Sequence, residues 1–169
     1  MDLTKLLGLG ALTEILRLRA PETPPTPSEA QLMEADLRAK RAATRILIVE
    51  DDVVNQLLTS KLVAALGYVA DVAGNGEEAI AALRQRSYSL ILMDCDMPVM
   101  NGHTATAFIR SAPSLAAFEE IPILALSGYV KKADKKRCLD SGMDEFLPKP
   151  VSRGDLGEAL DRWLLSNIR

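Results

Sequence analysis

Short apolar runs alternate with amphipathic segments from residue 45 to residue 166, and this alternation constrains the fold more than any other feature. Short apolar runs bounded by turn-forming or polar residues predict buried strands. We expect strands at residues 46–49, 69–73, 90–94, 121–126 and 145–147. Each run is followed by apolar residues at helical spacing. The expected helices include residues 54–66, 79–83, 102–110, 131–139 and 156–164.

Such alternation predicts an α/β fold in which helices cover both faces of a parallel sheet, with right-handed crossovers. We therefore expect a doubly wound (βα)5 domain with five parallel strands in the flavodoxin-like order 2-1-3-4-5. In open sheets of this kind, ligands bind beyond the carboxyl ends of the strands, where the winding reverses. With this order, the reversal lies between the first and third strands.

The folded domain is expected at residues 44–169, preceded by an N-terminal extension over residues 1–43. The extension begins with a leucine-rich segment whose apolar residues form no single helical stripe. Four prolines between residues 21 and 27 predict an extended linker. Ser28, with Gln31 three residues later, is typical of a helix cap, and we expect a mostly solvated helix to end near residue 43.

Composition and charge argue against several classes of function. Charged residues interrupt the leucine-rich segment, so no run reaches the ~20 apolar residues that span a bilayer. A net charge of −3 without a dense basic block argues against nucleic-acid binding, and the basic patch at 131–137 is interpreted as a solvated helix face. Cys95 and Cys138 follow no disulfide framework pattern, which favours a cytoplasmic location.

Acidic side chains end two of the predicted strands. Asp94 ends the run at residues 90–94, and the turn beyond it contains Pro98 and Gly102. Glu50 and Asp51 end the first strand in the same way. Because the first and third strands are expected to be neighbours at the winding reversal, the three carboxylates predict one cation site.

Two later strand ends supply groups that bind phosphate. The fourth predicted strand delivers a hydroxyl at Ser127, and the fifth delivers an ammonium at Lys149. Phosphoryl transfer requires a protein mainly to position reactants and to neutralise charge on the phosphoryl oxygens. Acids that bind a metal ion, together with a hydroxyl and an ammonium that bind these oxygens, would meet that requirement.

Taken in order, these five positions resemble the receiver domain of two-component response regulators, and the likeness extends from about Thr44 to the end of the chain. Asp94 matches the phosphoaccepting aspartate of that family, and Glu50 with Asp51 matches its acidic pair. Ser127 matches its Thr/Ser position, and Lys149 its Lys-Pro motif. The resemblance implies a signalling domain rather than an enzyme, which takes a phosphoryl group from a phosphohistidine of a histidine kinase or a histidine phosphotransfer protein.

The resemblance also implies Mg²⁺ as the cofactor. Asp51 and Asp94 would ligate the ion directly, Glu50 would act through water, and the backbone carbonyl of Asp96 would supply a further ligand. Lys149 and Ser127 would then bind the phosphoryl oxygens. In the family the Lys-Pro peptide bond is cis, which orients the ammonium inward.

The switch and the lifetime of the phosphorylated state are also matters of resemblance. Phe146 matches the family's switch aromatic, which would move together with Ser127. Asp96 and Tyr129 occupy positions that flank the attacking water and would tune the acyl-phosphate lifetime. The moving surface would comprise the helix at 131–139, the strand at 145–147 and the helix that carries Trp163, and a downstream protein partner would bind there.

Two residues near the site receive structural interpretations. His103 is the single histidine of the chain. One histidine without a cysteine or a second histidine makes no transition-metal site. The resemblance implies that His103 begins the third helix outside the pocket, so we expect a solvated side chain. Cys95 follows Asp94 but faces away from it by strand alternation, and we expect it to fill the core.

Two alternative functions are open. The run Asp94-Cys95-Asp96 also fits the D-x-D motif of haloacid-dehalogenase-type phosphatases, although only Asp155, Glu158 and Asp161 follow Lys149 as candidates for their second acidic pair. The nearer alternative concerns context, because the run 52–56 resembles receivers of hybrid histidine kinases. No output domain is expected after the last helix. The chain would then be either a receiver acting alone or the receiver end of a hybrid kinase, serving as a relay or a phosphate sink.

Overall fold

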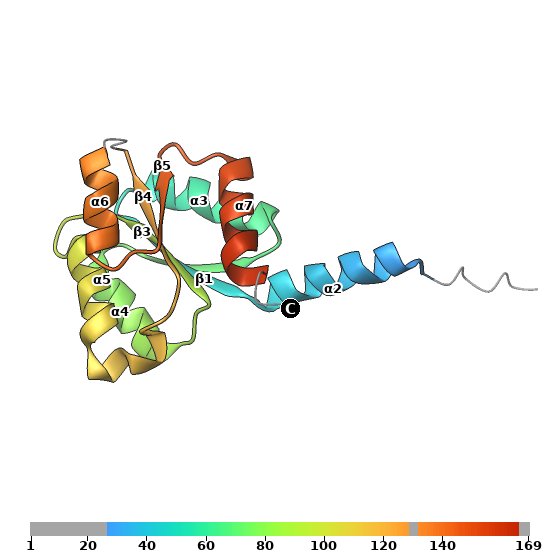
Figure 1. The fold of residues 1–169 in the computed structure, drawn as a ribbon, viewed down its shortest axis with the longest axis horizontal. Coiled ribbons are helices and arrows are strands. Elements are labelled where there is room, and N and C mark those ends of the chain that lie inside the picture. The colour runs from blue at the N-terminus through green and yellow to red at the C-terminus, as the bar shows by residue number, and fades with distance from the viewer. Residues whose placement is uncertain (1–26, 129–131, 166–169) are drawn as a thin grey trace, which may run out of the picture. The chain divides into compact units, whose positions relative to one another are not determined.

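The computed structural model describes residues 27–128 and 132–165, which include a sheet of five parallel strands with helices on both faces (Figure 1). The strands are β1 (Arg45–Val49), β2 (Val69–Ala73), β3 (Leu90–Asp94), β4 (Ile123–Ser127) and β5 (Glu145–Pro148). Their order is β2-β1-β3-β4-β5, and every neighbouring pair is parallel. The expected α/β fold and strand order are therefore confirmed.

The helices that follow the strands form two layers, one on each face of the sheet. In chain order, the described helices are α2 (Glu29–Ala43), α3 (Val53–Ala65), α4 (Gly76–Gln85), α5 (Gly102–Ser111), α6 (Lys132–Asp140) and α7 (Arg153–Leu165), with a 3-10 helix η2 (Pro113–Phe118) after α5. Figure 1 shows α3 and α7 on one face of the sheet, and α4, α5 and α6 on the other. Among the helices of the described residues, none combines the length and the hydropathy that crossing a membrane requires.

The core consists of two layers because successive strand residues point to opposite faces of the sheet. Leu47, Ile91 and Ile123 belong to the cluster beneath α4, α5 and α6. Their neighbours Ile46 and Leu92 belong to the cluster beneath α3 and α7. Parallel strands covered on both faces are apolar throughout, which is why the sequence shows continuous apolar runs here.

Polar residues cap the N-termini of α3, α4 and α5, the helices that follow the first three strands. Asp52, Asn75 and Asn101 each accept a hydrogen bond from a backbone N–H of the helix that follows, at 2.9–3.0 Å. Such caps satisfy backbone groups that the first helical turn leaves unpaired. At Gly102 a Cβ would overlap the carbonyl oxygen of Asp94, so this position requires glycine for the chain to turn tightly after β3.

The apolar stripe of α3 does not face the core as a whole. Val54, Leu57 and Leu58 are exposed, whereas Thr59 and Val63 are buried. Apolar residues occupy a wide arc of this helix, and the sheet covers only one side of that arc. The helical spacing therefore predicted the helix correctly but did not indicate which part of it packs on the sheet.

The N-terminal helix α2 matches its sequence signals. The Ser28 amide donates to Gln31 Oε1 at 2.7 Å, and the Gln31 amide donates to Ser28 Oγ at 3.3 Å, which forms the expected reciprocal cap. No residue of α2 is buried. The chain has two units when it is divided by its internal contacts, and the boundary between them lies within this helix, after Glu34. The leucine-rich segment and most of the proline linker lie outside the described residues.

Two boundaries differ from the predictions. The segment between the predicted helix at 102–110 and the predicted strand at 121–126 contains η2, which has proline at its N-terminus. Strand β4 begins at Ile123 instead of residue 121, because Pro122 has no N–H to contribute to the ladder. The carbonyl of Pro122 still accepts a hydrogen bond from the Ile91 amide at 2.9 Å.

Candidate functional site

Three carboxylates meet at the carboxyl ends of β1 and β3. Oxygen atoms of Glu50, Asp51 and Asp94 all lie within 4.8 Å of one another. Glu50 is 1% exposed and Asp94 6% exposed, whereas Asp51 is exposed. The sequence-based expectation that these acids would gather at the winding reversal agrees with this geometry.

Lys149 lies between the two buried acids. Its Nζ donates to Glu50 Oε2 at 2.5 Å and to Asp94 Oδ2 at 2.7 Å. Burial alone would lower the pKa of Lys149, but the hydrogen bonds to Asp94 and Glu50 outweigh it and raise the pKa. Burial raises the pKa of Glu50, and the charge of Asp94 adds to this, although Lys149 and Asn55 act in the opposite direction. The group as a whole carries three acids against one ammonium.

Further polar contacts orient the acids, and sequence reasoning had given two of the residues involved, Asn55 and Gln56, no role in the site. Asn55 Nδ2 donates to Glu50 Oε1 at 3.2 Å, and Gln56 Nε2 donates to the Glu50 carbonyl at 2.7 Å. The Asp96 amide donates to Asp94 Oδ1 at 3.2 Å. The sequence signal for Asn55 and Gln56 was available, since they lie in the first turn of the helix that directly follows the acidic pair.

The remaining predicted site residues occupy different surroundings. Ser127 is buried at the end of β4, and it lines a cavity of about 290 Å³ together with Asp96. Phe146 lies on β5 opposite Ala125 and packs, half-buried, against the core cluster beneath α6. The peptide bond between Lys149 and Pro150 is cis, as the resemblance implied. Tyr129 lies outside the described residues.

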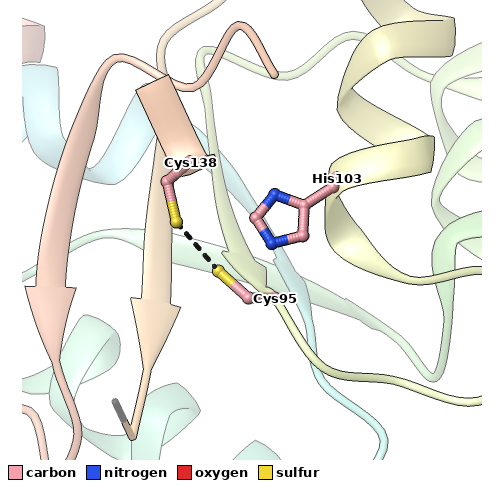
Figure 2. A group of neighbouring side chains, drawn as sticks. All are labelled: Cys95, His103 and Cys138. Atoms are coloured by element: carbon pink, nitrogen blue, oxygen red, sulfur yellow. Dashed lines mark hydrogen bonds between the residues drawn. The ribbon is translucent and has the colours of Figure 1, made fainter. Parts of the chain in front are cut away.

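The same cavity brings together a second group of side chains. Cys95, His103 and Cys138 line it, and one potential ligand atom from each lies within 4.8 Å of the others (Figure 2). Cys95 is 3% exposed, which agrees with its predicted place in the core. Burial raises the pKa of both thiols, so without a metal ion they are neutral.

The prediction for His103 is wrong in two respects: the side chain is half-buried instead of solvated, and two cysteines lie beside it. Its Nδ1 lies 3.2 Å from Ser141 Oγ. Burial, together with the charge of Arg137, lowers the pKa of His103, and Asp96 opposes this. Cys138 is 43 residues from Cys95 in sequence, so only the packing of α6 against β3 and α5 reveals that this histidine has cysteine neighbours.

Comparison with known proteins identifies the family. The response regulator receiver domain matches residues 46–161, which include Glu50, Asp51, Asp94, Ser127 and Lys149. The chain belongs to this family. It is a receiver domain of the two-component phosphorelay type, with the flavodoxin-like fold.

Related sequences are found in large signalling proteins. Over 120 residues the chain is 41% identical to hybrid signal transduction histidine kinase B of Dictyostelium discoideum. The match covers 66% of this chain and 6% of the kinase. It is 34% identical over 156 residues to transcription factor SKN7 of Saccharomyces cerevisiae, covering 92% of this chain and 24% of that protein. The chain thus spans a small part of the curated relatives it matches.

Solved receiver structures superpose on the sheet and its helices. The receiver domain of a sensor histidine kinase from Pseudomonas aeruginosa has a magnesium ion coordinated in its active-site cleft. It is 36% identical, has a TM-score of 0.66, and the match covers 73% of this chain and 98% of that one. The Saccharomyces cerevisiae receiver domain of Ssk1, crystallised with the histidine phosphotransfer protein Ypd1, is 28% identical, with a TM-score of 0.66 and coverage of 75% and 92%.

Proposed function

We propose that Asp94 is the phosphoacceptor of this receiver. A carboxylate oxygen of Asp94 attacks the phosphorus of a phosphohistidine, the P–O bond forms, and the P–N bond breaks with its electron pair remaining on the imidazole nitrogen. The product is an aspartyl phosphate. The observation that carries the proposal is Asp94 itself, buried at the end of β3 and hydrogen-bonded to Lys149 at 2.7 Å.

The group of acids fits a hard divalent cation. Three carboxylates within 4.8 Å of one another, with one ammonium among them, leave negative charge uncompensated. Mg²⁺ prefers oxygen ligands and is bound through one or two carboxylates together with phosphoryl oxygens. Glu50, Asp51, Asp94 and the carbonyl of Asp96 would hold it, and when bound it supplies positive charge to a phosphoryl oxygen.

Lys149 and Ser127 are proposed to bind the remaining phosphoryl oxygens. The ammonium of Lys149 already contacts the Asp94 oxygen, so it needs to move little to donate to an oxygen attached there. Ser127 lies at the end of β4, next to β3 in the sheet, and its carbonyl accepts a hydrogen bond from the Lys149 amide at 2.8 Å. That bond fixes the backbones of the two residues to each other.

The phosphoryl donor is proposed to be a histidine kinase or a histidine phosphotransfer protein that docks on α3. Val53, Val54, Leu57 and Leu58 of this helix are all more than half exposed. The helix begins directly after the acidic pair, and a groove of about 490 Å³ runs from Leu58 to Lys149. An apolar face beside the acceptor suits a protein that must bring its own histidine to Asp94. The free thiols favour the cytoplasm for this exchange.

Output is proposed to pass through α6, β5 and α7. Phosphorylation would draw Ser127 toward the new phosphoryl oxygens, and Phe146 would turn into the space beside β4. A downstream protein would read the changed surface. Two conformations separated by a few kcal/mol suffice, because the phosphoryl group need only favour one of them by a comparable free energy. The lifetime of the phosphorylated state, tuned by Asp96 and Tyr129, stays a prediction.

The alternatives differ in what supports them. As the receiver of a hybrid histidine kinase, the chain would pass its phosphoryl group onward, and similarity to such kinases supports this context. For a haloacid-dehalogenase-type phosphatase, a second acidic pair would have to come from Asp155, Glu158 and Asp161. Two of these carboxylates are bound elsewhere, Asp161 to Arg41 and Tyr68 and Asp155 to Ser152. We therefore propose a phosphoacceptor that catalyses only its own phosphorylation and dephosphorylation.

The acceptor assignment is tested by incubating the full chain with Mg²⁺ and acetyl phosphate. We expect one phosphoryl group per chain, released by hydroxylamine as an acyl phosphate is. Asp94→Asn should abolish it, and Asp155→Asn is the matched control. Label that persists on the Asp94→Asn variant would overturn the assignment.

A second measurement separates a switch from a phosphate sink. Backbone amide shifts are recorded with and without beryllofluoride, which mimics the phosphoryl group, in the presence of Mg²⁺. A switch predicts changes that extend through residues 127–150, and Ser127→Ala should confine them to the acidic site. Changes confined to the neighbours of Asp94 in the wild type would instead favour a relay element.

A further inference from the structure

Beside the proposed phosphorylation site, three side chains form a second group with a different chemistry. The Sγ atoms of Cys95 and Cys138 lie 3.4 Å apart, and the His103 ring lies beside them (Figure 2). The three residues come from the chain after β3, from α5 and from α6. Thiolate and imidazole are the ligands that Zn²⁺ prefers, whereas Mg²⁺ prefers oxygen.

The spacing of these atoms is close to that of a tetrahedral zinc centre. With Zn–S near ~2.3 Å and Zn–N near ~2.0 Å, tetrahedral ligand atoms lie roughly 3.5–3.8 Å from one another. The two sulfurs are already at 3.4 Å, and all three potential ligand atoms lie within 4.8 Å. Side-chain adjustments of about 1 Å would therefore be enough to surround an ion.

The hydrogen bonds of Ser141 present the correct nitrogen of His103. The Ser141 hydroxyl donates its single proton to the Cys138 carbonyl at 2.7 Å, so toward His103 it can only accept. Nδ1 of His103, at 3.2 Å, must then carry the proton. In the neutral ring this leaves the lone pair on Nε2, and a histidine fixed through its other nitrogen is typical of metal ligands.

The cavity of about 290 Å³ gives an ion a path to this group. Asp134 and Arg137 of α6 line it as well, together with Asp96 and Ser127. Two thiolates and one Zn²⁺ are together neutral, so the group could be completed without leaving a net charge beside the core. The fourth position would face the cavity, where water can enter.

We propose that Cys95, His103 and Cys138 form a Zn²⁺ site, distinct from the proposed Mg²⁺ site, with water as the fourth ligand. Binding converts two thiols into zinc-bound thiolates and releases two protons to solvent; no electrons are transferred. The site joins α6 to α5 and to the end of β3. If α6 moves on phosphorylation, as in the proposed function, bound zinc holds it in the unphosphorylated arrangement.

The test uses the full chain, reduced and freed of metal, titrated with Zn²⁺ against a chelating dye and separately with Co²⁺. We expect one Zn²⁺ per chain and, with Co²⁺, the near-ultraviolet charge-transfer absorption that thiolate ligands produce. Cys138→Ser should weaken Zn²⁺ binding by more than about 100-fold and remove the absorption, and His103→Gln should weaken binding by a similar factor. Ser141→Ala should weaken it by about 10-fold, the scale of losing a residue that orients a ligand.

Asp94→Asn is the control, because the acids could also hold Zn²⁺. Zinc binding that persists in this variant assigns the ion to the thiol group, whereas binding lost there and kept in Cys138→Ser would overturn the proposal. The proposal would also be overturned if the reduced chain binds no Zn²⁺ and if, under oxidant, a Cys95–Cys138 disulfide forms as fast in His103→Gln as in the wild type. Phosphorylation by acetyl phosphate with Mg²⁺ is independent of either result, so failure here leaves the proposed function intact.

Discussion

Two polar clusters of this domain each join distant parts of the chain. The charges of one cluster balance within the protein, whereas those of the other do not. In the first, Asp161 of α7 accepts two hydrogen bonds from Arg41 at 2.7 and 2.8 Å and one from Tyr68 at 3.0 Å. In the second, Lys149 donates to Glu50 and Asp94. We call them the Asp161 cluster and the acidic site.

The Asp161 cluster pairs one carboxylate with one guanidinium, so its charge is balanced within the protein. The acidic site holds Glu50, Asp51 and Asp94 against Lys149 alone, so it carries an excess of negative charge. Uncompensated charge in a buried place costs stability, and proteins keep it where a ligand supplies the missing charge. The comparison thus separates a cluster whose charges are paired within the protein from one that leaves negative charge unpaired, as the proposed binding of a cation and a phosphoryl group requires.

The largest effect is expected from removing the ammonium of the acidic site. In buffer without divalent cations, Lys149→Met should lower the free energy of unfolding by about 3 kcal/mol, because two buried carboxylates lose their partner. Urea denaturation measures this, and Mg²⁺ should reduce the deficit. Lys136→Met removes an exposed i,i+4 pair with Asp140 and should change stability by less than ~0.5 kcal/mol. A Lys149→Met protein as stable as this control would show that the acids do not repel.

The Asp161 cluster should give a pH dependence in the alkaline range. Burial, followed by the hydrogen bond to Asp161, raises the pKa of Tyr68 to about 12 from its ordinary value of 10.0. The folded state therefore keeps a proton that the unfolded chain loses, so stability falls as pH rises from about 10 to about 12. At ~1.36 kcal/mol per pKa unit the loss is at most about 2.7 kcal/mol. Unfolding of Tyr68→Phe, followed over the same range, should lack this part of the slope; equal slopes in both proteins would contradict it.

Truncating the acid of the balanced cluster should destabilise the domain. Asp161→Ala removes three hydrogen bonds to one carboxylate and should lower the free energy of unfolding by about 2 kcal/mol. Thermal and urea unfolding would measure the change. Asp36→Ala is the matched control, since Asp36 pairs only with Lys40 on the solvated face of α2 and its loss should cost less than ~0.5 kcal/mol.

Neutralising an acid of the unbalanced cluster should have the opposite sign. Two like charges ~4 Å apart repel by about 4 kcal/mol at an effective dielectric constant near 20, and losing the Lys149 partner offsets most of this. Asp94→Asn should therefore raise the free energy of unfolding by about 1 kcal/mol without Mg²⁺, and Mg²⁺ should no longer stabilise it. A loss of stability equal to that of Asp161→Ala would remove the distinction between the two clusters.

The acidic site could be predicted from sequence because its residues stand at the ends of apolar strands. Parallel strands deliver their carboxyl ends to the same edge of a sheet, so Glu50 and Asp94 are brought together by topology alone. Asn55 and Gln56 lie beside Glu50 because the helix after β1 turns its first residues back over the acid, and the sequence indicated this only through their place in the first turn of that helix.

The sequence did not reveal the exposed face of α3 or the cysteine neighbours of His103, for a common physical reason. Helical spacing identified α3, but the exposure of Val54 and Leu57 depends on where the sheet ends. His103 stands eight residues after Cys95, and Cys138 a further 35 residues on, so no motif spacing connects them. Contacts between side chains of different helices follow from packing angles and distances, which periodicity along one segment does not contain.

The sequence by itself determined the five-stranded parallel fold and the edge of the sheet at which the acids gather. These features depend on strand and helix periodicity and on the ends of the strands, which are local properties of the chain. Only the tertiary structure decided which face of α3 meets solvent, how Arg41 and Tyr68 reach Asp161, and that two thiols and an imidazole share one cavity. These depend on the docking of separate elements, where displacements of a few ångströms decide whether side chains meet.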